Sequence, residues 1–138
     1  MSAMKIHFLL IMVFACLPIS NTLADSEAVV QLLGEYAVQG ANKPSAEKGR
    51  LLWEKVFTGG KRFPERSCTS CHSQNLKQAG RHVRTKKSIE PMAPSVNPER
   101  LTSVQEISKW FKRNCKWTIG RECTASEKAS LLAYLKQQ

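Results

Sequence analysis

The hydrophobic positions of this chain follow the spacing of amphipathic helices in four segments. Apolar side chains recur every three or four positions over residues 26–38 and 46–56, and again in two segments after residue 101. Such spacing places apolar side chains on one face of a helix, whereas a half-buried strand alternates at every second residue. Residues 61–87 show little periodicity. We therefore predict an all-α chain whose middle segment is irregular.

Capping residues indicate where the helices begin. Ser45 can cap the second helix, because a serine hydroxyl accepts a hydrogen bond from an otherwise unpartnered backbone N–H of the first turn. Thr102 with Gln105, and Thr124 with Glu127, have the spacing of a capping box, in which each residue of the pair bonds the backbone of the other. We expect the two C-terminal helices to begin at these pairs.

Gly49 lies inside the second predicted helix, one turn before Trp53 on the same face. A glycine within a helix costs about 1 kcal/mol relative to alanine, so its presence needs a structural reason. Close approach of another helix is such a reason, and we expect a helix crossing here.

Residues 1–24 have the features of a secretory signal peptide. A positive residue precedes a ten-residue apolar stretch, and small residues before Asp25 offer a cleavage site. The apolar stretch is too short to span a membrane. A lipobox-like segment ending at Cys16 suggests lipoprotein anchoring as an alternative, although Phe14 fits that pattern poorly. We expect export to a bacterial periplasm and one domain, residues 25–138, which is long enough for a single core.

One short motif carries specific chemistry: Cys68-Thr69-Ser70-Cys71-His72. Two thiols at this spacing can each form a thioether with a vinyl group of one porphyrin, which is how a c-type haem is attached. His72 is carried beneath the ring, where its imidazole can bind the iron as the fifth ligand. We therefore predict one covalent haem c, attached through Cys68 and Cys71.

Two other kinds of site use the same cysteine spacing. Dithiol oxidoreductases place it beside a βαβ unit, which the helical pattern does not provide. A zinc ribbon requires a second close cysteine pair, whereas Cys115 and Cys123 are eight positions apart. In an oxidising compartment we expect these two cysteines to pair with each other and to stabilise the fold by somewhat under about 3 kcal/mol.

The chain is strongly basic, with 21 Lys and Arg against 11 Asp and Glu, and removal of residues 1–24 leaves a net charge of about +9. Residues 61–87 contain eight basic residues and one acidic residue, Glu65. This surface is either simply solvated, or it neutralises the haem propionates and docks an acidic redox partner. Nucleic acid is not the expected partner, given the predicted export and the lack of interleaved aromatic residues.

Three residues are candidates for the sixth iron ligand, and two of them lie between residues 80 and 100. His82 follows His72 by only ten positions, so its reach around the haem edge is short. Met92 belongs to a stiff loop, Pro91 to Pro98, that should lie across the haem, and a thioether is the ordinary sixth ligand of electron-transfer cytochromes. Alternatively, Met92 is only an apolar lid packed on the porphyrin.

The third candidate, Asn114, is polar but continues the apolar stripe Val104, Ile107, Trp110 and Phe111 of its helix. One explanation is a helix C-cap, a common place for asparagine. The other is an axial amide, a weak and hard ligand that would hold ferric iron and release ferrous iron, with Trp110 and Phe111 shielding the pocket. A disulfide at the next residue would tether a ligand that leaves and returns. The residues alone do not decide between this amide and the thioether.

Several segments together resemble the sphaeroides haem protein (SHP) family, small periplasmic monohaem cytochromes c that bind oxygen. They are Thr58-Gly59-Gly60-Lys61, the haem motif, the loop from Pro91 to Pro98, Arg113-Asn114-Cys115 and Ile119-Gly120-Arg121-Glu122-Cys123-Thr124. The likeness extends from about residue 31 to the C-terminus. The last two segments are more distinctive than the haem motif alone.

The resemblance implies a class I cytochrome c fold, in which an N-terminal and a C-terminal helix cross. Gly49 and Trp53 would then meet Leu132 and Tyr134 at the crossing, which supplies the reason for the glycine.

The resemblance also implies roles for individual residues and for partners. Asn114 would be the sixth ligand of ferric iron and would depart on reduction, and Cys115 and Cys123 would form a disulfide. Family members are associated with a dihaem cytochrome c and a membrane cytochrome b as electron donors, and a nitric oxide dioxygenase activity has been proposed for the family.

Two functional hypotheses therefore stand at this point. In the first, reduction frees the site for O2, NO or CO, and the released Asn114 amide can donate a hydrogen bond to the gas. In the second, Met92 stays bound and the protein is a plain electron carrier. A methionine in the Pro91–Pro98 loop departs from the family pattern, and it keeps the second hypothesis open.

Overall fold

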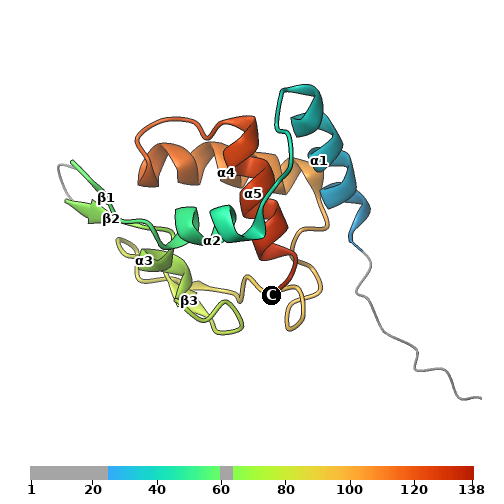
Figure 1. The fold of residues 1–138 in the computed structure, drawn as a ribbon. Helices are drawn as coiled ribbons and strands as arrows, with labels where there is room; N and C mark the ends of the chain where they lie inside the picture. The colour runs from blue at the N-terminus through green and yellow to red at the C-terminus, as the bar shows by residue number, and fades with distance from the viewer. Residues whose placement is uncertain (1–24, 60–63) are drawn as a thin grey trace, which may run out of the picture.

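The computed structural model describes residues 25–59 and 64–138, so the predicted signal peptide lies outside the described residues. The helices are α1 (Glu27–Val38), α2 (Ala46–Glu54), α3 (Thr69–His72), α4 (Val104–Thr118) and α5 (Ala125–Leu135) (Figure 1). Two antiparallel pairs of two-residue strands accompany them, β1 (Phe57–Thr58) with β2 (Glu65–Arg66) and β3 (Gly80–Arg81) with β4 (Ser88–Ile89). The predicted all-α class is confirmed, and strands this short leave no periodicity to detect.

Two of the predicted helix starts are confirmed by their caps. The Ser45 hydroxyl accepts a hydrogen bond from the Lys48 N–H at the start of α2. Thr124 and Glu127 form a complete capping box at the start of α5, with each side chain bonded to the backbone of the other residue. These starts were predictable because a cap depends only on residues within one turn.

The predicted start of α4 is wrong by one residue. The N-cap is Ser103, whose hydroxyl accepts a hydrogen bond from the Glu106 N–H. The Thr102 hydroxyl instead donates to the Glu99 carbonyl, at 2.8 Å, in the preceding turn. Thr102 is therefore occupied by the turn, and no Thr102–Gln105 capping box forms.

Helices α2 and α5 cross in contact, as Figure 1 shows at the centre of the molecule. A Cβ atom built on Gly49 would overlap the Ser130 carbonyl and lie 2.8 Å from Tyr134 Cβ. The predicted reason for this glycine is therefore confirmed, because only a residue without a side chain permits this approach. The aromatic rings of Trp53 and Tyr134 lie 6.3 Å apart beside the crossing.

The core consists of two hydrophobic clusters that share α4 and α5. The first, here called the α1 cluster, is made of Ala28, Val29, Leu32, Tyr36, Ala41, Ile107, Ala129 and Leu132. The second, the Trp53 cluster, is made of Trp53, Leu76, Ala93, Cys115, Cys123, Leu131 and Leu135. Leu132 thus belongs to the α1 cluster and Leu131 to the Trp53 cluster, while Tyr134 lies at the crossing as predicted.

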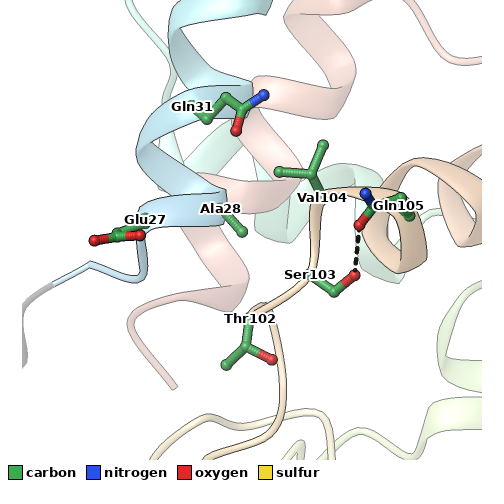
Figure 2. Close-up of a pocket in the computed structure, with 7 residues that line it drawn as sticks. All are labelled: Glu27, Ala28, Gln31, Thr102, Ser103, Val104 and Gln105. Atoms are coloured by element: carbon green, nitrogen blue, oxygen red, sulfur yellow. Dashed lines mark hydrogen bonds between the residues drawn. The ribbon is translucent and has the colours of Figure 1, made fainter.

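One surface pocket, of about 380 Å³, lies where the start of α1 meets the start of α4. Figure 2 shows that its lining includes the Ser103 hydroxyl bonded to the Gln105 side chain. No predicted haem or ligand residue lines this pocket, so it is separate from the predicted haem site. Among the described helices, none has the length and apolar character needed to cross a membrane.

Candidate haem site

The two thiols of the haem motif lie on one side of a single helical turn. The Cys71 and His72 N–H groups both donate to the Cys68 carbonyl, at 3.2 and 3.1 Å, which forms the turn that becomes α3. Cys68 and Cys71 are free, half-buried thiols. Residues three apart on a helical turn are neighbours on its surface, so both thiols can reach one porphyrin.

A pair of serines holds this turn in place. The Ser70 hydroxyl accepts from the Ser67 N–H at 3.0 Å, and the Ser67 hydroxyl accepts from the Ser70 N–H at 3.1 Å. Ser67 is buried, and its hydroxyl also lies 2.7 Å from the Thr69 hydroxyl. We did not predict this role, although the Ser-x-x-Ser spacing resembles a capping pair.

Gly80 of β3 lies directly against the haem motif. A Cβ atom at this position would overlap the Cys71 carbonyl and lie 2.9 Å from His72 Cα. Segments 71–72 and 80–81 therefore pack backbone to backbone. The sequence offered no periodic signal for this contact.

His72 is suited to bind a metal as a neutral imidazole. Burial, followed by the nearby charges of Arg100 and His82, lowers the pKa of His72 to about 4. Its Nδ1 atom is buried and has no hydrogen-bond partner among the described residues. The ring lies 5.3 Å from that of Trp53, which places the imidazole at the edge of the Trp53 cluster.

The environment of Cys68 argues against a dithiol oxidoreductase. Burial, and then the neighbouring Cys71, raises the pKa of the Cys68 thiol to about 12. Catalytic dithiols require a lowered thiol pKa, because the thiolate is the attacking species. A zinc site also lacks support, since no three His, Cys, Asp or Glu side chains gather into a possible metal site within residues 25–59 and 64–138.

The loop that carries Met92 is held over the Trp53 cluster. The Met92 and Ala93 N–H groups donate to the Leu76 carbonyl at 2.9 and 3.0 Å, and the Met92 side chain packs on the cluster together with Cys68. Arg100 braces the same loop from outside by donating to the Pro91 carbonyl at 2.8 Å. This role of Arg100 was missed, because it depends on a contact nine residues away.

Asn114 lies within α4 and is half-buried. The helix continues to Thr118 and its C-cap is Ile119, so the explanation of Asn114 as a C-cap is wrong. Phe111, one turn earlier, packs on the Trp53 cluster, and Cys115, the next residue, belongs to it. Across the described part of the chain, the Asn114 side chain makes no hydrogen bond.

Cys115 and Cys123 are bonded to each other in the structure, with Cα atoms 5.6 Å apart. Cys115 lies in the last turn of α4, and Cys123 immediately precedes Thr124, the N-cap of α5. The bond therefore fixes the end of the helix that carries Asn114 to the start of the C-terminal helix.

The position of His82 argues against a second histidine ligand. Its Nδ1 atom accepts hydrogen bonds from the Arg84 and Thr85 N–H groups, at 3.3 and 3.1 Å, in the turn between β3 and β4. An accepting Nδ1 places the ring proton on Nε2, so iron binding by Nε2 would require this turn to give up those bonds.

Trp110 is the predicted site residue that the structure places at the surface. Its side chain is 44% exposed, and its indole N–H donates to Glu106 at 3.0 Å. Lys109 and Arg113 lie over the ring at 5.3 and 5.1 Å from its centroid. Trp110 therefore lies at the surface although it is in phase with the apolar stripe, and its role in shielding the pocket stays a prediction. Phe111 is half-buried and packs on both clusters.

Within residues 25–59 and 64–138, three buried nitrogen atoms in or near the haem motif have no hydrogen-bond partner: Trp53 Nε1, Arg66 Nε and His72 Nδ1. A buried N–H without an acceptor costs about 1–3 kcal/mol, so such atoms indicate a bound group that completes the site. Two free thiols, a neutral imidazole and buried donors are the groups that a covalently attached, carboxylate-bearing porphyrin requires. The residues therefore fit a haem c.

Comparisons with known proteins agree with this site. A family model described as a domain of unknown function (DUF1924) matches residues 39–135. The chain is 44% identical to the cytochrome c-type protein SHP of Cereibacter sphaeroides over 117 residues, 84% of this chain and 88% of SHP. It is 34% identical to cytochrome c'' of Methylophilus methylotrophus over 134 residues, 91% of each chain.

Solved structures give the same assignment. Oxidized SHP, described as an oxygen-binding cytochrome c, superposes with a TM-score of 0.73 at 40% identity, over 83% of this chain and all of that one. Cytochrome c'' of M. methylotrophus in solution, described with respect to haem-ligand detachment, gives 0.67 at 31% identity, over 80% of this chain and 93% of that one. The chain therefore belongs to the DUF1924 family and is a member of the SHP group of cytochromes c, which carry one covalently bound haem.

Proposed function

We propose that this monohaem cytochrome c uses His72 and Asn114 as its axial ligands in the ferric state and releases Asn114 on reduction. The observation that carries the proposal is the position of Asn114, half-buried within α4 beside the Trp53 cluster and without a hydrogen bond among the described residues. The amide oxygen thus has no competing hydrogen bond within the described protein and can bind the iron of the haem, whose reduction supplies the change that releases it.

The chemistry of the amide explains why it would leave. Its carbonyl oxygen is a hard, weak donor, which suits ferric iron better than ferrous iron. The bond between Cys115 and Cys123 restrains the adjacent helix end, so that Asn114 can depart and return without loss of register. Release would leave a coordination position for O2, NO or CO, and the amide N–H could then donate to the gas.

The descriptions of two relatives, SHP and cytochrome c'', support this proposal. SHP is described as binding oxygen, and cytochrome c'' is described with respect to haem-ligand detachment. Oxygen binding requires an available coordination position, and detachment of a ligand is a way to provide one.

A second candidate function is plain electron transfer with Met92 permanently bound. The observation in its favour is that Met92 packs on the same cluster as Cys68 and Phe111. A bound thioether would favour ferrous iron and raise the reduction potential. It would also leave no position for a gas.

Optical spectra of the purified haem protein distinguish the two functions. We expect a low-spin ferric spectrum, and a high-spin ferrous spectrum that changes on addition of CO or NO. Asn114→Ala should convert the ferric protein to high spin, because the amide is lost. Met92→Leu, the matched control, should leave both spectra unchanged. A ferrous protein that stays low spin and indifferent to CO, and becomes high spin in Met92→Leu, would instead establish the electron carrier.

We further propose that the protein is periplasmic and receives electrons from an acidic partner, of the kind represented by a dihaem cytochrome c or a membrane cytochrome b. Six ion pairs link described residues, and none involves a basic residue of segment 64–100. This segment therefore offers unneutralised positive charge, and the rate of reduction by such a partner should fall as salt screens it.

Conversion of bound O2 and NO to nitrate is the reaction we propose to test on the ferrous protein. Nitrate formed in amounts equal to the O2-bound protein, on addition of NO, would establish it. Simple displacement of O2 by NO without nitrate would leave gas binding and electron transfer as the whole function.

A further inference from the structure

Arg66 links the segment that anchors the haem to the helix that carries Asn114. It lies in β2, two residues before Cys68, and its Nη1 donates to the Trp117 carbonyl at 2.6 Å. Its Cζ lies 6.0 Å from the centre of the Trp117 ring. Trp117 follows Asn114 by three positions in α4. The Arg66 side chain therefore attaches the last turn of α4 to the segment that leads into the haem motif.

The end of α4 requires donors from outside the regular helix. The last four carbonyl groups of a helix have no intrahelical partner, and the helix dipole makes this end partly negative. The Cys115 carbonyl accepts the N–H of the C-cap residue, Ile119, and the Trp117 carbonyl accepts from the Arg66 guanidinium. Arg66 thus brings a donor and a positive charge to the C-terminal end of α4, where both are favourable.

The backbone that carries the Arg66 side chain is itself fixed. Arg66 pairs with Phe57 across the β1–β2 ladder. The next residue, buried Ser67, exchanges hydrogen bonds with Ser70 and so holds the haem motif. Because the guanidinium extends from a segment held on both sides, its bond to Trp117 can fix the position of the helix end relative to the haem motif.

A fixed helix end matters for a weak iron ligand. The bond between Cys115 and Cys123 restrains the end of α4 relative to the start of α5, and Arg66 restrains it relative to the haem motif. Restraint of a group near its binding position removes part of the entropy that binding otherwise costs. An axial amide held in this way returns to ferric iron more readily than one on an unrestrained helix end.

We propose that Arg66 is a positioning residue for the distal ligand, because its bond to the Trp117 carbonyl holds Asn114 within reach of ferric iron. The inference rests on the proposed function, since it requires that Asn114 binds the iron. It goes further by assigning part of the strength of the ferric bond to a residue beside the haem motif. After reduction Asn114 has left the iron, so Arg66 should no longer influence the open coordination position.

The test compares variants of the purified holoprotein. Arg66→Met keeps the apolar part of the side chain and removes its donors and its charge. Arg66→Lys keeps the charge, but its ammonium lies near the position of Cζ, short of the Trp117 carbonyl. Arg81→Met is the matched control, because Arg81 is an exposed arginine that also donates to a backbone carbonyl, that of Lys86 at 3.0 Å. The readouts are the ferric spin state, the affinity of the ferric protein for imidazole, and the affinity of the ferrous protein for CO.

We expect ferric Arg66→Met to bind imidazole about tenfold more tightly than the unchanged protein, because loss of a hydrogen bond from a charged donor frees the site and an entering ligand binds in proportion to the open fraction. Its high-spin fraction without imidazole should also rise. Arg66→Lys should show a smaller increase in affinity, and Arg81→Met none. The CO affinity of the three ferrous variants should equal that of the unchanged protein.

Two results would overturn the proposal directly. Equal imidazole affinities in Arg66→Met and the unchanged protein would show that the bond to Trp117 does not support the ligand. A change in CO affinity as large as the change in imidazole affinity would reveal a general disturbance of the haem pocket. If Arg66→Met does not accumulate with haem attached, Arg66→Lys decides, and an imidazole affinity equal to that of the unchanged protein would then count against the proposal.

Asn114→Ala separates failure of this inference from failure of the proposed function. If Arg66 acts through the amide, adding Arg66→Met to Asn114→Ala should leave the imidazole affinity of that variant unchanged. A further increase in the double variant would overturn the inference, although Asn114 would remain the ligand. A ferric Asn114→Ala protein that stays low spin would instead contradict the proposed function, and the inference with it.

Discussion

The α1 cluster and the Trp53 cluster share helices α4 and α5 and yet are completed differently. The α1 cluster contains aliphatic side chains and Tyr36, and it includes none of the three buried nitrogens that lack a partner in the described part of the chain. The Trp53 cluster contains Trp53 itself, has His72 at its edge, and is flanked by the half-buried Cys68, Met92 and Phe111. The difference teaches that the protein alone finishes the first core, whereas the second requires a cofactor.

Helix α5 shows how closely the two cores adjoin. Leu132 packs in the α1 cluster, while Leu131 and Leu135 pack in the Trp53 cluster. Adjacent leucines on one helix therefore serve different cores. The Gly49 crossing holds this shared helix against α2, so damage at the crossing should affect both.

The largest effect should come from loss of the haem, in Cys68→Ser combined with Cys71→Ser. Without thioethers the cofactor is no longer held covalently, and the Trp53 cluster loses its missing component. Amide hydrogen exchange should accelerate in residues 64–100 by at least about tenfold more than in α1, because opening free energies differ between cooperative units. Equal acceleration in both regions would mean that the two cores form one cooperative unit.

Gly49→Ala should destabilise the whole protein by about 3 kcal/mol or more, since the added Cβ meets the Ser130 backbone, which cannot yield easily. Denaturant unfolding of the holoprotein measures this change. Gly34→Ala is the matched control, because Gly34 lies in α1 and a Cβ there meets nothing within 4 Å. That control should stabilise the protein by up to about 1 kcal/mol. A Gly49→Ala protein as stable as the unchanged one would refute the close crossing.

Replacement of Cys115 and Cys123 together by serine should reduce the free energy of unfolding by about 2.5 kcal/mol, the value expected for a loop with this separation of 8 residues. The loss should fall on the Trp53 cluster, to which both cysteines belong. Hydrogen exchange that accelerates first in α1 would contradict this placement.

Glu127→Gln should have the smallest effect, about 1 kcal/mol at neutral pH, because the ion pair is partly exposed. The hydrogen bond from Arg121, helped by the Thr124 backbone N–H, lowers the pKa of Glu127 to about 2 from its ordinary value of 4.5. A lowered pKa stabilises the fold above the ordinary value, and this stabilisation is lost as pH falls from 4.5 to 2. The free energy of unfolding, measured between pH 2 and 4.5, should therefore change less with pH in Glu127→Gln than in the unchanged protein. An equal dependence on pH in the two proteins would show that the Arg121–Glu127 pair contributes nothing to stability.

The residues alone determined the features that depend on short separations in the chain. The haem motif was predictable because its thiols and imidazole act within five consecutive positions, and the Thr124–Glu127 capping box because it closes within one turn. The close approach of another helix to α2 was predictable, because the cost of a glycine within a helix indicated a close neighbour at Gly49.

Only the tertiary structure decided which residues meet across long separations. It placed Trp110 at the surface despite its phase in the apolar stripe, and it divided Leu131 from Leu132 between two cores. It also brought Arg66 to the Trp117 carbonyl, 51 positions away. Periodicity reports only that a face is apolar, while the partner of that face depends on how the whole chain packs around itself and its haem.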